Sequence, residues 1–267
     1  MLSKEQKQNI LTSYNDGKSI NAIAKENHIS WDTVKRFLLT QFEELIPCVN
    51  QFQKQSQKLD FLFQIVADAE TAYWLGFLYA DGSIRSGSRN EITLELKAED
   101  YDIIKAFHEF CHNTNMIREH VIERNGRSFK SYVSSFSNKQ VKENLINLGC
   151  VPKKSLILTC PSEQQVPNEF LFDFIRGYFD GDGYGRFDKE QHKYDIVVLG
   201  TEQFLTGIVK RIGWEDKLVI GPTDTKVFKM ATYKQHDVYE FLRLMYDNER
   251  IALPRKKQIF LQAKSGL

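Results

Sequence analysis

The sequence predicts an α+β fold, in which a small all-α unit precedes two pseudo-symmetric copies of an αββαββα repeat. Two similar segments carry this prediction: residues 74–82 (WLGFLYADG) and residues 175–183 (IRGYFDGDG), whose Gly76 and Gly177 stand 101 residues apart. A second pair, PKK at residues 152–154 and PRK at residues 254–256, follows at an offset of 102. A nearly constant offset between several features indicates a duplicated structural unit. We therefore predict one repeat over residues 68–160 and another over residues 161–267.

Composition excludes several classes of protein. The chain has 267 residues, 42% of them apolar, and a formal net charge of +1, which is typical of a folded chain. The longest apolar run covers residues 73–80, far short of the roughly 20 residues that span a bilayer. Lys4, Glu5 and Lys7 interrupt the N-terminus before a signal peptide could form, so we expect no membrane partner and a location in the cytoplasm or wherever the host DNA resides. The near-zero charge by itself argues against a nucleic-acid partner.

Residues 1–42 show a dense helical pattern with clear boundaries. We expect a helix ending near Tyr14, a short helix over residues 19–26, and a third over residues 31–39 with Ser30 as its N-cap. The segment SINAIAKENHISWDTVKRFL (residues 19–38) resembles the helix-turn-helix of resolvases and many repressors, although His28 stands where that family usually has Gly. The resemblance implies a recognition helix that presents to DNA Ser30, Trp31, Thr33, Lys35 and Arg36. The alternative is a three-helix bundle that contacts protein. Residues 43–67 are rich in Gln and contain Pro47, which indicates a linker.

Each repeat has the same expected order of elements. An apolar helix ends in Asp-Gly, and two strands, a helix, two further strands and a last helix follow. In the first repeat the strands are expected near residues 83–85, 92–97, 116–123 and 129–136, with the middle helix over residues 100–112. In the second they are expected near residues 185–188, 194–199, 218–220 and 227–233, with the middle helix over residues 201–212.

This pattern resembles the two-motif, monomeric form of the LAGLIDADG homing endonucleases, over residues 68–264. The resemblance implies a saddle of antiparallel sheets on the major groove of double-stranded DNA, and site-specific, Mg²⁺-dependent cleavage by a monomer. Small residues at i and i+4, Gly76 with Ala80 and Gly177 with Gly181, clear one face of each motif helix, so the two helices can pack closely.

Close packing of the motif helices brings Asp81 and Asp182 to adjacent helix ends. Two carboxylates at the negative ends of helix dipoles repel each other and suit a divalent cation such as Mg²⁺. The resemblance implies two or three divalent ions held by Asp81 and Asp182 and by the carbonyls of Ala80 and Gly181. It also implies a catalytic basic residue near each scissile phosphate, which the repeat assigns to Lys154 and Lys256, with Lys153, Arg255 and Lys257 as neighbouring alternatives.

Alternate side chains of the strands are expected to face the bases. The basic and polar candidates for DNA contact are Arg85, Arg89, Glu91, Thr93, Arg118, His120, Arg124, Arg127 and Lys130 in the first repeat, and Arg186, Asp188, Lys193, Lys226 and Lys229 in the second. Because basic residues gather on expected strands and acidic ones on expected helices, the net charge hides a segregated pattern. The two repeats differ in sequence, so we expect a long, asymmetric target.

Two other functions remain open for this sequence. A non-cleaving transcription regulator can carry a homing-endonuclease fold beside a helix-turn-helix, but retention of both Asp81 and Asp182 argues against it. An intron maturase would use the same fold to bind intron RNA. The first and last residues of the chain do not resemble those of an intein.

Overall fold

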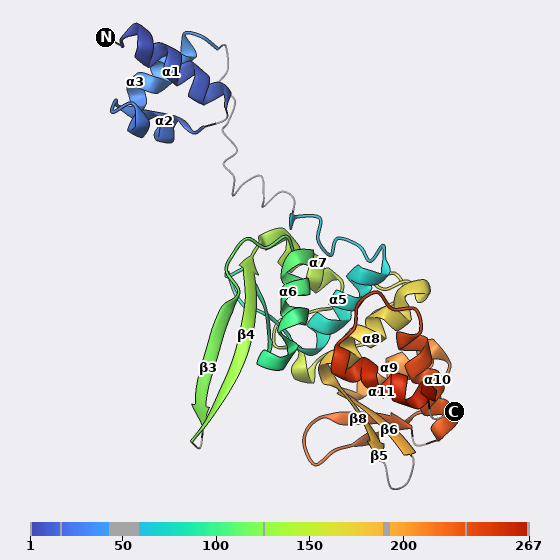
Figure 1. Ribbon diagram of the computed structural model, residues 1–267. Coiled ribbons are helices and arrows are strands. Elements are labelled where there is room, and N and C mark those ends of the chain that lie inside the picture. Colours follow the sequence, from blue (N-terminus) through green and yellow to red (C-terminus); the bar gives the residue numbers. More distant parts are fainter. Residues whose placement is uncertain are drawn as a thin grey trace. The chain divides into compact units, whose positions relative to one another are not determined.

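A computed structural model describes residues 2–16, 18–42, 59–124, 126–188, 193–232 and 234–265 (Figure 1). The chain divides into two compact units, Met1–Lys58 and Leu59–Leu267. The expected linker residues 43–58 and the side chain of Asp188 lie outside the described residues.

The N-terminal unit consists of three helices around a small apolar core. They are α1 (Lys4–Asn15), α2 (Ile20–Glu26) and α3 (Trp31–Leu39), and the hydroxyls of Ser3, Ser19 and Ser30 accept hydrogen bonds from the first turn of the helix that each precedes. Their core contains Ile10, Ile23, Ala24, Val34 and Leu38. His28 has a φ of 53° in the turn between α2 and α3, so it adopts the left-handed conformation that Gly usually takes.

The larger unit contains two four-stranded antiparallel sheets with the same topology, β1-β2-β4-β3 and β5-β6-β8-β7. The first repeat runs through α5 (Ala69–Ala80), β1 (Gly82–Ile84), β2 (Glu91–Lys97), α6 (Tyr101–Phe110), β3 (Arg118–Arg124), β4 (Arg127–Ser137) and α7 (Lys139–Asn147). The second runs through α8 (Leu171–Asp182), β5 (Gly183–Asp188), β6 (Lys193–Gly200), α9 (Glu202–Ile212), β7 (Val219–Pro222), β8 (Phe228–Thr232) and α10 (Gln235–Tyr246). The predicted α+β class and the order αββαββα are confirmed in both copies.

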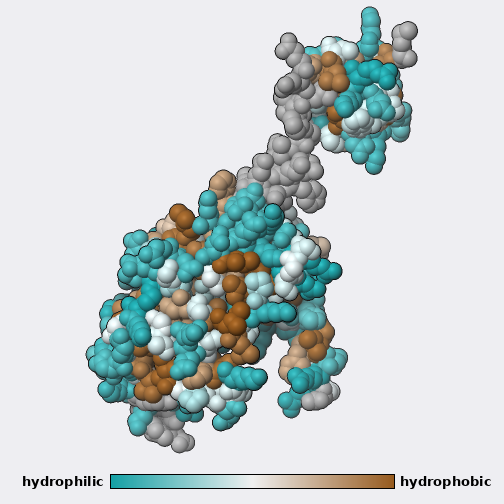
Figure 2. Space-filling model, turned by 180° about the vertical axis from the view of Figure 1, so that it is seen from behind, coloured by the Kyte–Doolittle hydropathy of each residue, from teal (hydrophilic) through white to brown (hydrophobic). Residues whose placement is uncertain are grey.

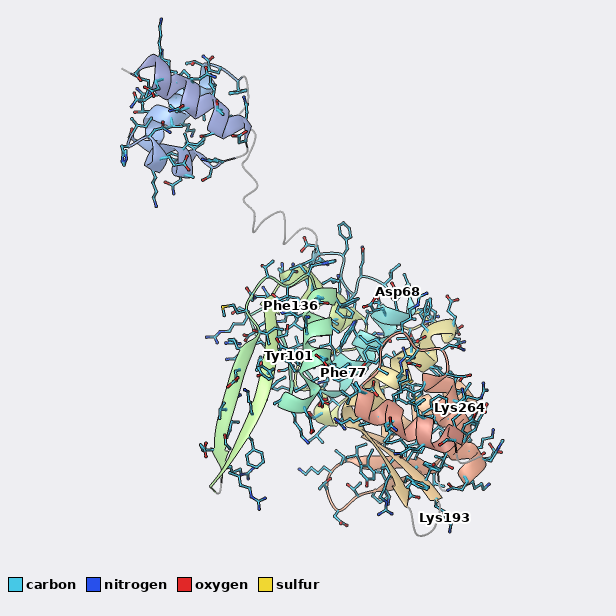
Figure 3. The ribbon with its side chains drawn as sticks, viewed as in Figure 1. Asp68, Phe77, Tyr101, Phe136, Lys193 and Lys264 are labelled. Carbon is cyan, nitrogen blue, oxygen red and sulfur yellow. The ribbon has the colours of Figure 1, made fainter. Side chains whose placement is uncertain are left out.

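A single apolar core joins the two repeats through α5 and α8, which pack against each other along their length. Helix α6 covers one face of the first sheet at β2 and β4, and α9 covers the second sheet at β6, β7 and β8. Figure 3 shows Phe77 and Phe136 inside this unit, whereas Lys193 and Lys264 lie on its outside. Among the described residues, no helix is both long enough and apolar enough to cross a bilayer.

The structure differs from the sequence-based prediction at two points. Leu59, Phe63 and Val66 are buried in the core of the larger unit, so its packed part begins before residue 68, where the linker was expected to end. The second Pro-basic element forms the first turn of a further helix, α11 (Pro254–Ser265), whereas the first leads only into a short 3₁₀ turn, Lys154–Leu156. Phe260 and Ala263 of α11 are buried, so packing against the core stabilises a helix that the repeat pattern did not predict.

Candidate active site and nucleic-acid interface

The motif helices α5 and α8 meet backbone to backbone at two glycines. A Cβ added to Gly76 would lie 2.0 Å from the carbonyl oxygen of Phe174, and one added to Gly177 would lie 1.9 Å from that of Tyr73. Tyr73 and Phe174 are themselves 101 residues apart, so the two contacts are related by the same internal symmetry as the glycines. Any side chain at either position would push the helices apart.

The helices α5 and α8 also contact each other at their C-terminal ends. A Cβ added to Gly181 would lie 2.4 Å from the Cβ of Ala80 and 3.1 Å from Oδ2 of Asp81. Asp81 is the C-cap of α5, and Asp182 is the last residue of α8. The Asp81 carboxylate therefore lies beside the end of α8, close to Asp182 and to both helix C-termini.

The surroundings of the two aspartates disfavour their charged forms. Crowding by protein atoms and the charge of Asp182 raise the pKa of Asp81 to about 6, although Lys154 and Lys256 partly oppose the shift. Burial likewise raises the pKa of Asp182, against the same two lysines. Two carboxylates in this position repel each other, so the site favours a bound cation or proton.

A buried lysine accompanies each aspartate. Lys154 donates from Nζ to the carbonyl of Gly82, and Lys256 donates to the carbonyls of Gly183 and, at 2.9 Å, Phe179. Gly82 and Gly183 are symmetry equivalents that directly follow the aspartates. Burial and the neighbouring Arg255 lower the pKa of Lys256 to about 8.

The alternative basic residues are engaged elsewhere or exposed. Arg255 forms an ion pair with Asp100 at 3.1 Å, and Lys257 pairs with Glu249. Lys153 is exposed and has a φ of 57°. Lys154 and Lys256 are thus the two candidates that hydrogen-bond the backbone at the aspartate-bearing ends of α5 and α8.

Asp180 is a site residue that the sequence did not identify. Its buried carboxylate accepts hydrogen bonds from the hydroxyls of Tyr73 and Tyr246 and, at 2.7 Å, from the backbone N–H of Leu253. These bonds tie α8 to the segment that leads into Lys256. Tyr79, its counterpart at an offset of 101, donates to the carbonyl of Leu148 instead. In the sequence, this difference between the two motifs was indicated only by Tyr79, which stands where the second motif has an acidic residue.

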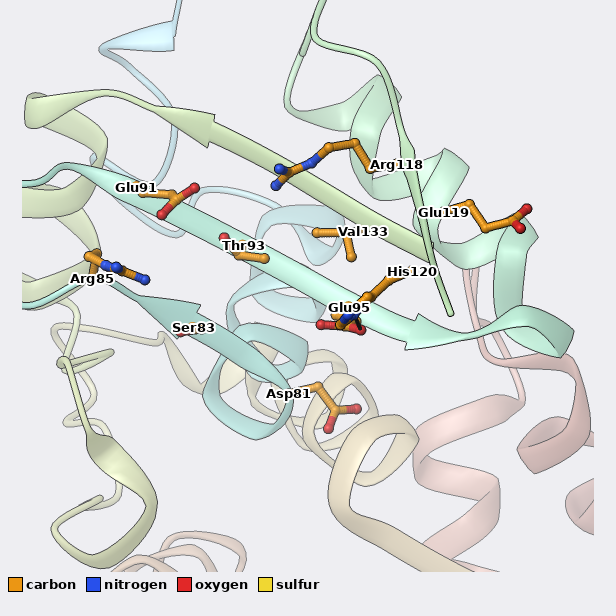
Figure 4. A pocket seen from close by; sticks show the side chains of 10 residues that line it. All are labelled: Asp81, Ser83, Arg85, Glu91, Thr93, Glu95, Arg118, Glu119, His120 and Val133. Carbon is orange, nitrogen blue, oxygen red and sulfur yellow. Dashed lines mark hydrogen bonds and ion pairs between the residues drawn. The ribbon is translucent and has the colours of Figure 1, made fainter. Parts of the chain in front are cut away.

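A groove of about 510 Å³ extends from Asp81 along the exposed face of the first sheet (Figure 4). Its lining is mostly polar or charged: Asp81, Ser83, Arg85, Glu91, Thr93, Glu95, Arg118, Glu119, His120 and Val133. Burial alone would raise the pKa of Glu95, but hydrogen bonds from Ser131 and His120 outweigh it and lower that pKa. Glu91 and Glu95 therefore lie among the basic residues of this face, so the expected segregation of acids onto helices is wrong for this sheet.

Strand register decides which candidates for DNA contact share the groove face. Arg85, Thr93 and Arg118 line the groove, and Arg124 and Arg127 pair with each other on the same face. Lys130 pairs with Val121 on the opposite face and forms an ion pair with Glu119 at 2.6 Å, so the structure does not bring it together with Arg85, Thr93 and Arg118. Arg89 lies at a separate hollow beside Asn115 and Ser135.

The remaining candidates lie on the second sheet and on the N-terminal unit. Arg186, Lys193 and Lys229 share the uncovered face of the second sheet, and Lys226 is exposed between β7 and β8. On α3, Trp31 is 43% exposed with the Lys35 ammonium 4.8 Å from its ring centre, and Arg36 is exposed. The hydroxyls of Ser30 and Thr33 are hydrogen-bonded to each other at 2.8 Å.

The LAGLIDADG homing-endonuclease fold consists of two αββαββα units. Their first helices pair at glycines, and each of these helices ends in an acidic residue. The homing endonuclease I-WcaI, solved bound to its DNA recognition sequence, matches at 10% identity with a TM-score of 0.57, over 81% of this chain and 94% of that one. The LAGLIDADG meganuclease I-AabMI matches at 10% identity with a TM-score of 0.47, over 73% and 89% of the two chains. The N-terminal LAGLIDADG domain of DUF199/WhiA matches at 14% identity with a TM-score of 0.44, over 76% and 95%.

The likeness to I-WcaI confirms the predicted resemblance at the level of fold. No protein-family model matches the chain, and no curated protein is significantly similar to it in sequence.

Proposed function

We propose that this protein is a site-specific, Mg²⁺-dependent double-strand DNA endonuclease of the LAGLIDADG homing type. The observation that carries the proposal is the placement of Asp81 and Asp182 at the touching ends of α5 and α8, where Asp81 opens onto a groove that runs along a strand face. Both acids come from one chain, so a monomer holds a complete site.

The donor set suits a hard divalent cation. The carboxylates of Asp81 and Asp182, with the carbonyls of Ala80 and Gly181 beside them, offer the oxygen ligands that Mg²⁺ prefers. Within the described residues, no cluster of three or more His, Cys, Asp and Glu side chains forms a metal site, so the proposed site depends on these two acids and on carbonyls. Bound Mg²⁺ would activate water and stabilise the leaving oxygen of a phosphodiester.

The lysines complement this site. Lys154 and Lys256 hold the backbone that directly follows each aspartate, and their positive charges offset the two carboxylates. A positive charge at each helix end would also stabilise negative charge that develops on a scissile phosphate. Equivalent basic groups in both halves fit one cut on each strand.

The strand faces provide the surface for the duplex. Arg118 and Arg124 on the first sheet, and Lys229 on the second, lie on the faces that the helices leave uncovered. We propose that the three-helix unit extends the DNA footprint through α3, with Trp31 and Arg36 exposed on it.

Cleavage of a randomised duplex library with Mg²⁺, followed by sequencing of the ends, tests the proposal. We expect specific double-strand cuts from the wild type, and loss of cutting with retained binding in Asp81→Asn and Asp182→Asn. Asp216→Asn, a matched change at an exposed turn, should cut normally. Tight duplex binding without any cutting by the wild type would refute nuclease activity and favour the non-cleaving regulator. Binding of intron RNA in preference to duplex DNA would favour the maturase.

A further inference from the structure

The uncovered faces of the two sheets differ in chemistry at equivalent positions. Ser83 and Tyr184 each stand two residues beyond a motif aspartate, and they pair with Thr93 and Val197 on the neighbouring strands. Thr93 in turn pairs with Ser135, whereas Val197 pairs with Ala231. A Ser or Thr in the first repeat thus corresponds to Tyr, Val or Ala in the second, so the second repeat has more apolar carbon surface and fewer hydroxyls at these positions.

The difference continues along the strands. Glu95, two residues beyond Thr93, corresponds to Leu199, two residues beyond Val197. On the second sheet Tyr184, Leu199 and Val219 are 54%, 39% and 64% exposed, so their apolar surface is open to solvent. Exposed apolar side chains that gather on one strand face are a candidate binding surface.

Tyr184, Leu199 and Val219 form an apolar strip, and the charged residues that border it suit DNA. Lys193 and Lys229 are exposed on the same face, where Asp195 is paired with Arg186 at 3.2 Å. Positive groups beside the strip suit phosphates, and the strip begins two residues from Asp182, just as the polar face begins two residues from Asp81. A duplex seated symmetrically on both aspartates would place bases against both faces.

We propose that the half-site on the second sheet is recognised through thymine methyl groups, whereas the half-site on the first sheet is recognised through hydrogen bonds to base edges. This inference depends on the proposed DNA binding. In the major groove, the C5-methyl of thymine is the one apolar group that a base pair presents, and aliphatic or aromatic side chains contact it. Ser83, Thr93, Glu95 and Arg118 instead offer donors and acceptors.

The first sheet also carries apolar groups, but far from the aspartates. Ile122 and Phe129 pair with each other near the tip of the β3–β4 hairpin, and they are 49% and 55% exposed. Figure 2 shows hydrophobic surface on this projecting hairpin. The predicted contrast therefore applies to the inner base pairs of each half-site, next to the cut.

Deoxyuridine substitution tests the inference, because it removes only the methyl group. Targets selected from the randomised library should contain thymine at the inner positions of one half-site. With the full chain in EDTA, replacing those thymines by deoxyuridine should weaken binding about fourfold for each contacted methyl, the factor for one buried methyl-sized group. The same replacement at inner positions of the other half should change Kd less than about twofold.

Variants assign the effect to the second sheet. Tyr184→Ser with Val197→Thr installs the residues of the first repeat and should reduce the deoxyuridine effect toward that of the other half-site. Val121→Thr, at an exposed apolar residue on the opposite face of the β3–β4 hairpin, should leave the effect unchanged. Equal effects in both halves, no effect in either, or a selected site without inner thymine would overturn the inference while DNA binding stands. If the apolar face binds a protein partner and not the thymine methyl groups, deoxyuridine will have no effect in either half-site. Failure to bind any duplex would instead refute the proposed function, and the inference with it.

Discussion

Gly177→Ala tests the packing on which the site depends. The added Cβ would lie 1.9 Å from the carbonyl oxygen of Tyr73, and a real Cβ essentially never approaches another heavy atom within 3.0 Å. The obstacle is helix backbone and cannot rotate away, so α5 and α8 must separate by about 1 Å. A gap of that size forfeits roughly a quarter to a half of the dispersion energy of each contact that it opens.

The expected cost follows from two opposing effects. Overpacking a core costs about 1–3 kcal/mol, and a backbone obstacle places this case at the upper end. Ala is favoured over Gly in a helix interior by about 1 kcal/mol. We therefore expect the free energy of unfolding to fall by about 2 kcal/mol, which corresponds to a Tm lower by roughly 4–8 °C for a unit of this size.

Urea and thermal unfolding of Gly177→Ala, Gly76→Ala and Gly221→Ala measure the effect. Gly76→Ala should match Gly177→Ala, because its Cβ meets Phe174 in the symmetry-equivalent way. A Cβ at Gly221 meets nothing within 4 Å, so this control should change stability by less than about 0.5 kcal/mol. If Gly177→Ala proves as stable as the control, the helices do not pack backbone to backbone and the assigned convergence of the aspartates fails.

Three further predictions concern the ends of the motif helices. Gly181→Ala should destabilise the protein, because its Cβ meets that of Ala80. The double exchange Ala80→Gly with Gly181→Ala should restore most of the lost free energy of unfolding, measured in urea. A double variant no more stable than Gly181→Ala alone would contradict this contact. The raised pKa of Asp81, about 6, means that the folded chain binds more protons than the unfolded chain between roughly pH 4 and 6, so without metal the Tm should fall as pH rises through about 6. Asp81→Asn should reduce that slope without removing it, because burial also raises the pKa of Asp180 to about 6, and a flat wild-type profile would count against the crowded carboxylates. Lys154→Met leaves a buried carbonyl without its donor and should cost about 1–3 kcal/mol, whereas Lys153→Met at the exposed neighbour should cost almost nothing by the same assay.

The sequence by itself determined the duplication, and with it most of the fold. The paired glycines at an offset of 101 predicted two equivalent units and the close contact of their motif helices, because only small residues allow backbones to approach. Local pattern likewise placed Ser30 as the cap of α3 and the turn at His28.

Only the tertiary structure decided which side chains work together. Spacing could not choose among the adjacent basic residues, because the choice depends on which of them reaches the carbonyl beyond each aspartate. The buried role of Asp180 depends on Tyr246 and Leu253, which are distant in sequence. The opposite chemistry of the two strand faces was hidden for the same reason: Tyr184, Val197 and Ala231 belong to three strands, and strand register alone brings them side by side.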